Sequence, residues 1–109
     1  MEPTNKLLQL VETLINRTTA GKANWSQGSQ DDTFLWSTTS GSVAVFPKDH
    51  DNQPPYVLRV LGSQGEVLEE EVFFGGYEGF DAVVALFKVA RRNALDIDSM
   101  ISNFLGEHG

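Results

Sequence analysis

The 109-residue chain contains no cysteine, which excludes disulfide bonds, thiolate metal sites and a cysteine nucleophile. It has two histidines, and no apolar run approaches the ~18 residues that a membrane-spanning helix needs. The first 20 residues also lack the basic start and the apolar segment of a signal peptide. We therefore expect a cytoplasmic protein that does not insert into a membrane.

Positive charge is scarce, because eight Lys and Arg residues face 15 Asp and Glu residues, for a net charge of −7. The excess is concentrated in residues 31–74, where eight acidic residues are balanced only by Lys48 and Arg59. Such a surface repels phosphate backbones, so we expect no nucleic-acid partner. The hydrophobic share of 40 % is sufficient for one globular domain with its own core, over residues 1–109.

Three segments have apolar residues at helical spacing. The first runs from a possible N-cap at Thr4 to a left-handed stop at Gly21. The second begins near Phe80, and Leu86 and Val89 widen its apolar face enough to suggest more than one neighbour. The third is capped by Asp96 or Asp98 and ends at Gly106. Its apolar residues are expected to pack on the protein: Ile97, Ile101, Phe104 and Leu105.

Between residues 22 and 74 the period changes to two, which indicates β-strands. Four strands are predicted in "TFLWSTT", "SGSVAVFP", "YVLRVL" and "EVLEEEVFF", with a further short strand around Trp25. A tight turn at Ser40-Gly41 joins the first two. Strands in one run with helices at the ends predict an α+β fold. It comprises an N-terminal helix, an antiparallel meander of four to five strands, and two C-terminal helices packed on one sheet face.

The turn around Gly65 predicts a register for the last hairpin. With Gly65 left-handed, Arg59 faces Glu69, Leu61 faces Val67 and Tyr56 faces Val72. Glu70 then lies on the apolar face of its strand, where a desolvated carboxylate would suit acid–base chemistry. The other interpretations are that Glu70 reaches water at a sheet edge, or that the register differs. The run of three glutamates from residue 69 is also typical of edge protection.

The stretch "KDHDNQPP", residues 48–55, resembles a chemical site because two aspartates flank His50. A metal needs three or four converging ligands, and the other histidine, His108, is in the C-terminal tail. As a catalytic base, His50 would need a nucleophile or a substrate pocket, and the sequence indicates neither. We interpret the stretch as a solvated loop between two strands, and we predict no catalytic residue, no metal site and no cofactor.

A pattern over most of the chain resembles a group of small uncharacterised bacterial proteins. It consists of an amphipathic helix, a "T..GK..W" junction at Thr19, Gly21, Lys22 and Trp25, a meander and a closing helix. The 48–55 insert and the third helix depart from this pattern. The group has no assigned activity, so the resemblance implies a fold and carries no functional residue.

The leading functional hypothesis is a non-enzymatic interaction or adaptor module, with a protein partner or as a homodimer. The first alternative is an immunity or inhibitor protein that neutralises a basic partner, because acidic surfaces steer association with cations. The second is a small acid–base enzyme that uses Glu70 or His50. The residues predicted to contact a partner are Trp36, Glu69, Glu71, Leu86 and Val89.

Overall fold

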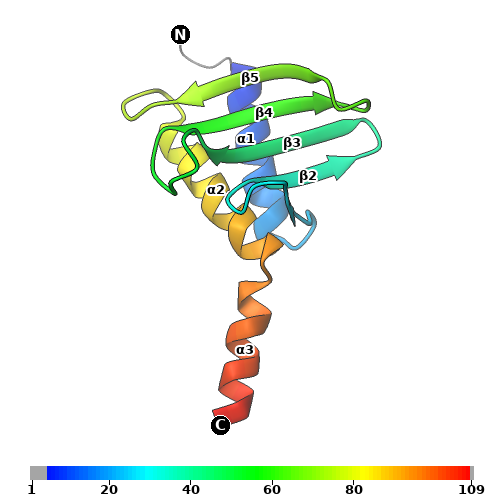
Figure 1. Ribbon diagram of the computed structural model, residues 1–109, viewed down its shortest axis with the longest axis vertical. Helices are drawn as coiled ribbons and strands as arrows, with labels where there is room; N and C mark the ends of the chain where they lie inside the picture. The colour runs from blue at the N-terminus through cyan, green and yellow to red at the C-terminus, as the bar shows by residue number, and fades with distance from the viewer. Residues whose placement is uncertain (1–4, 109) are drawn as a thin grey trace.

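A computed structural model describes residues 5–108, apart from the side chains of residues 5, 98, 107 and 108. The chain forms a helix, five strands and two helices (Figure 1). Their bounds are α1 Asn5–Thr19, β1 Ser26–Gln27, β2 Phe34–Thr38, β3 Gly41–Pro47, β4 Tyr56–Gly62, β5 Val67–Phe73, α2 Phe80–Ala94 and α3 Ile97–His108. The predicted cap at Thr4 and the side chains of Asp98 and His108 lie outside the described residues.

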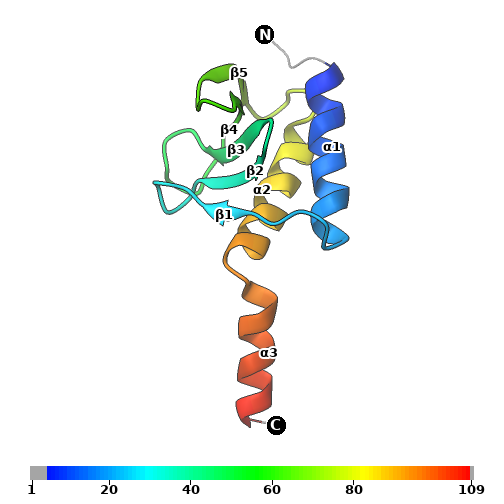
Figure 2. The same cartoon turned by 90° about the vertical axis from the view of Figure 1, so that its right-hand side faces the viewer.

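The strands form one antiparallel sheet in the order β1-β2-β3-β4-β5, so each strand pairs with its neighbour in sequence. Helices α1 and α2 lie together on one face of this sheet, and no helix of residues 5–108 covers the opposite face (Figure 2). The predicted α+β architecture is confirmed. The long meander leaves β5 and the two-residue β1 as the sheet edges.

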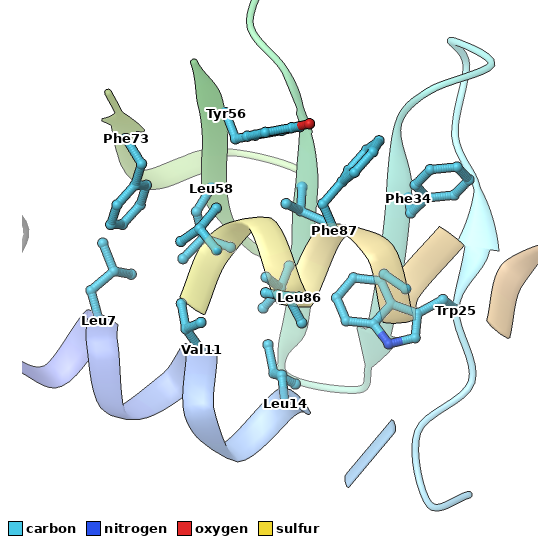
Figure 3. Close-up of a cluster of buried hydrophobic side chains, with 14 residues drawn as sticks. Leu7, Val11, Leu14, Trp25, Phe34, Tyr56, Leu58, Phe73, Leu86 and Phe87 are labelled. Carbon is cyan, nitrogen blue, oxygen red and sulfur yellow. The ribbon is translucent and has the colours of Figure 1, made fainter. Parts of the chain in front are cut away.

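The core lies between the sheet and the two helices (Figure 3). It forms because alternate residues of each strand point to one face, while α1 and α2 contribute residues at helical spacing. Burying each large apolar side chain stabilises the fold by about 1.5–3 kcal/mol relative to exposure. The core side chains with the lowest exposure include Val11, Leu14, Phe34, Val45, Leu58, Phe73, Val83 and Leu86.

The junction between α1 and the sheet is closed by hydrogen bonds from Trp25. Its indole Nε1 donates to Thr18 Oγ1 at 2.8 Å, and its backbone N–H donates to Asn93 Oδ1 at 2.6 Å. Gly21 adopts the left-handed conformation with φ 75°, as predicted for the residue that stops α1. Trp25 is buried, so its role is to join α1, β1 and α2 rather than to offer a stacking surface.

The register of the last hairpin differs from the prediction by one residue. The turn is as expected, because Gly62 N–H donates to Glu66 O and Leu61 faces Val67. Beyond this pair a β-bulge at Leu68 inserts one residue, which reverses the direction of every later side chain of β5. Glu70 therefore faces Arg59, and Tyr56 faces Phe73 instead of Val72.

Helix α3 projects from the body along the longest dimension of the molecule, which measures 51 Å (Figure 1). The prediction that its apolar residues would pack was wrong for Ile101, Phe104 and Leu105, which are exposed, whereas Ile97 is half-buried. Gly106 does not end the helix, which continues to His108. None of the helices in residues 5–108 combines the length and apolar character that crossing a membrane requires.

Candidate functional site

The 48–55 loop is an ordered connection between β3 and β4. The two strands meet at the pair Pro47–Tyr56, and Lys48 N–H donates to Pro55 O at 2.9 Å across the base of the loop. His50 and Asn52 both adopt left-handed backbone conformations, with φ 55° and 61°. Left-handed non-glycine residues are uncommon outside tight turns and functional segments. These two residues tighten the loop and bring the imidazole back toward the sheet.

The loop positions His50 against the turn that precedes β2. His50 Nδ1 lies 2.6 Å from Asp32 Oδ1, and the ring stacks on Phe46 with centroids 5.5 Å apart and an interplanar angle of 5°. A carboxylate oxygen accepts, so Nδ1 carries the proton and Nε2 is left for another interaction. An aromatic face and a carboxylate thus hold the imidazole in one orientation.

Asp32 was not predicted as a site residue. It is 8 % exposed, and its Oδ2 is buried without a hydrogen-bond partner. The β2–β3 register contains the signal that could have found it. Counting back two residues from the Phe34–Val45 pair places Asp32 beside Pro47, at the entrance of the 48–55 loop.

The Asp32–His50 pair has neither a metal cluster nor an activated nucleophile. Among the described side chains, no three His, Asp or Glu residues gather to hold a metal ion. Ser29 lines the same pocket as His50, but no hydrogen bond joins the two side chains. The geometry is that of an oriented imidazole beside a buried carboxylate.

Glu70 does not occupy the apolar environment that the predicted register implied. Its Oε1 accepts a 2.5 Å hydrogen bond from Arg59 Nε on the face of the sheet opposite the helices, and both side chains are part-exposed. The Arg59 guanidinium also lies over the Phe46 ring, 4.9 Å from its centroid. Glu70 is therefore half of a surface ion pair, of a kind that contributes about 0–1 kcal/mol to stability.

The five residues predicted to contact a partner do not form one surface. Leu86 is fully buried, and Trp36 and Val89 pack on the edge of the same core. Glu69 and Glu71 belong to β5, a free edge of the sheet, and they pair with Val60 and Leu58 of β4. The broad apolar face of α2 is thus used to contact α1 and the sheet within one chain.

The larger group of exposed apolar side chains lies on α3, whereas Val67, Leu68 and Phe74 are exposed on β5 and just after it. The stripe of α3, Met100, Ile101, Phe104 and Leu105, has exposed fractions between 46 and 68 %. The spacing of its members places all four on one side of the helix. The helix contacts α2 at its start, and the rest extends away from the body (Figure 2). Monomeric proteins seldom expose four neighbouring large apolar side chains, so this stripe is a candidate interaction surface.

Tyr56 links the 48–55 loop to stability at alkaline pH. Burial raises the pKa of its hydroxyl above the ordinary value of 10.0, and the Asp51 carboxylate raises this pKa further. The unfolded chain therefore loses the phenolic proton at a lower pH than the folded chain does. Stability is fully present below about pH 10 and falls as the pH rises through the folded-state pKa.

We expect Tyr56→Phe to make this alkaline loss of stability shallower. The measurement is the urea midpoint of both proteins at intervals from about pH 8 to about pH 11. Tyr77→Phe is the matched control, because Tyr77 lies in the turn before α2 and is only half-buried. If the urea midpoints of wild type and Tyr56→Phe fall in parallel with pH, the loss of stability does not come from Tyr56.

Comparison with protein-family models, with curated proteins and with solved structures found no match to this chain. The resemblance to small bacterial proteins stays a prediction. Two features of the molecule could take part in a function, the Asp32–His50 pair and the stripe of α3.

Proposed function

We propose that this protein is a non-enzymatic protein–protein interaction module, and that the stripe of α3 docks in an apolar groove on another protein. The observation that carries the proposal is the exposure of Met100, Ile101, Phe104 and Leu105 on a helix that projects from the body. An amphipathic helix that enters a groove through residues at this spacing is a recurrent mode of recognition. A bacterial, cytoplasmic setting belongs to the same proposal.

The charge of the C-terminal segment favours a partner other than a second copy. Residues 96–109 contain Asp96, Asp98 and Glu107 and no Lys or Arg. Two α3 helices side by side, in either direction, would bring carboxylates together at both ends, which opposes pairing. A groove edged by Lys or Arg complements both the apolar stripe and its acidic ends.

The net charge also favours a basic partner over a second copy of the chain. An inhibitor or immunity protein is the more specific version of this proposal. The chain carries −7 in total, and its excess of acids is greatest over residues 31–74. Acidic surfaces accelerate the encounter with basic proteins and lose this advantage at high salt. A basic partner would thus be attracted by the body of the protein and held by α3.

A pair of designed peptides tests the proposal. One is a fluorescein-labelled amphipathic helix of leucine and lysine, about 18 residues long so that it is helical, and the other replaces lysine by glutamate. We expect the leucine–lysine peptide to bind wild type. The double substitution Phe104→Ser and Leu105→Ser should weaken binding at least about tenfold, because two large apolar side chains no longer become buried. Fluorescence anisotropy measures both affinities.

The controls separate apolar docking from adsorption by charge. The double serine variant has the same net charge as wild type, so binding that depends on charge alone would survive in it. Ser102→Ala and Asn103→Ala change the polar side of α3 and should leave the affinity unaltered. Equal affinities of wild type and the double serine variant would refute the proposal. If light scattering shows that wild type is a dimer and that the double serine variant is a monomer, the partner of α3 is a second copy of the chain.

A further inference from the structure

A second feature of the molecule, separate from α3, is a pocket between the turn at residues 28–33 and the 48–55 loop. Its volume is about 360 Å³, and it is lined by Ser29, Gln30, Asp31, Asp32, His50 and Asn52. The backbone bond from Gly28 N–H to Thr33 O, 2.7 Å, closes the turn on one side. The Asp32–His50 hydrogen bond joins the two segments. The pocket is therefore built by ordered chain on both sides.

The lining of this pocket is suited to accept hydrogen bonds. Its carboxylates, side-chain amides and hydroxyl all offer oxygen acceptors. No Lys or Arg lines the pocket. Ionised carboxylates only accept, so a ligand that contacts Asp31 or Asp32 must bring N–H or O–H donors of its own.

The charges around the pocket favour a cation. Asp31, Asp32, Asp49 and Asp51 all belong to the two segments that form it, and Lys48 is the one Lys or Arg within residues 28–33 and 48–55. The Lys48 ammonium lies over the Phe74 ring, 6.0 Å from its centroid, and is not part of the lining. Asp31 and Asp32 line the pocket itself, and the one basic group beside them in the lining is the imidazole of His50.

The carboxylate of Asp32 supplies an independent indication of a ligand. Its side chain is 10 % exposed, and Oδ2 has no hydrogen-bond partner although the opposite oxygen is held by His50. A buried acceptor without a donor is destabilising by about 1–3 kcal/mol, and more if it is charged. A cationic ligand with N–H donors would both pair with this oxygen and compensate the charge of the carboxylate.

We propose that this pocket binds a cationic group with several N–H donors, a guanidinium or a primary ammonium. Asp32 supplies the countercharge, and His50 orients that carboxylate through its Nδ1–H. Asp31 and the amide oxygens of Gln30 and Asn52 accept the remaining donors. Guanidinium fits best, because its planar fork of five donors matches a set of acceptors spread around a pocket. The site stands on residues other than those of α3.

The test uses N-acetyl-arginine amide, with N-acetyl-citrulline amide as its neutral isostere. Backbone amide shifts of residues 28–33 and 48–53 are followed by two-dimensional NMR during titration. We expect the arginine derivative to shift these signals in a saturable way and the citrulline derivative to leave them in place. Asp32→Asn keeps the shape of the side chain and removes its charge, so affinity should fall about tenfold or more.

Asp81→Asn is the matched control, because it makes the same change of charge on an exposed residue in the first turn of α2. It should bind like wild type. If Asp32→Asn does not fold, Asp31→Asn replaces it, since that side chain is exposed. Equal shifts with arginine and citrulline derivatives, the absence of saturable shifts, or equal losses in the Asp32 and Asp81 variants would each overturn the proposal.

A second arm distinguishes the two sources of the cation. A blocked tripeptide with arginine between two glycines is titrated in the same way as the single amino acid. Tighter binding of the tripeptide indicates an arginine side chain presented by a protein, because the flanking backbone then adds contacts. Equal affinity indicates a free small cation. Both results support the site, and neither depends on whether α3 binds a partner.

Discussion

Phe34→Ala is expected to lower the free energy of unfolding by about 3–5 kcal/mol. Phe34 is 1 % exposed, and its ring lies 5.6 Å from that of Phe87, centroid to centroid. It starts β2 and packs against α2, so its removal leaves a cavity between the sheet and the helix layer. The surrounding strands are paired on both sides and are unable to close this cavity without losing their register.

The measurement is equilibrium unfolding in urea, followed by tryptophan fluorescence and by circular dichroism. A loss of this size is a large share of the 5–15 kcal/mol that is usual for a whole domain. Leu68→Ala is the control, because Leu68 lies at the bulge of an edge strand with 65 % of its surface exposed. We expect less than about 0.5 kcal/mol for that change. Similar losses in both variants would mean that the described core is wrong.

The second large effect is expected for Gly41→Ala at the β2–β3 hairpin. Gly41 has φ 154°, and a Cβ atom there would overlap the backbone carbonyl oxygen of Leu61 in the neighbouring strand. A backbone atom held by the sheet cannot move aside as a flexible side chain does. We expect a loss of about 2–4 kcal/mol, from backbone strain and overpacking together.

This loss should appear as a fall of roughly 10–20 °C in the thermal midpoint, measured by circular dichroism. Gly75→Ala is the matched control, because a Cβ atom at Gly75 meets open space and its φ lies outside the left-handed range. The control should unfold within a few degrees of wild type. An unchanged midpoint for Gly41→Ala would show that β3 and β4 do not approach as closely as described.

The hairpin at Gly41 also determines whether the Asp32 pocket exists. Its register places Phe34 opposite Val45, and Asp32 consequently reaches the loop that carries His50. A slip of one residue would turn the side chains of β2 to the other face. We therefore expect Gly41→Ala, if it folds, to weaken the arginine-dependent shifts along with stability.

Much of the fold could be predicted because it depends on neighbours in sequence. Helical spacing located α1 and α2, and Gly21 and Gly65 have the left-handed conformations that their positions indicated. The predicted turn at Ser40-Gly41 placed β2 beside β3, although the turn itself is Thr39-Ser40 and Gly41 is the first residue of β3. In each case the decisive interactions join residues a few positions apart, so a pattern in the sequence is enough to reveal them.

The candidate site was harder to predict, because its residues are far apart in sequence. His50 was singled out, but its partner Asp32 lies 18 positions earlier and comes near only through the pairing of β2 with β3. Glu70 was assigned to the wrong face because a bulge at Leu68 has no clear signal in a run of strand-forming residues. Because the register differs by one residue, Glu70 pairs with Arg59 on the surface and is not a buried acid.

The sequence by itself determined the order of elements, the antiparallel meander, the acidic charge and the amphipathic character of the three helices. Only the tertiary structure decided which apolar faces are covered. The stripes of α1 and α2 are buried against the sheet, whereas that of α3 is exposed because this helix leaves the body after Asp96. Amphipathic spacing records that a face prefers burial, and the path of the chain decides whether that face meets its own protein or another.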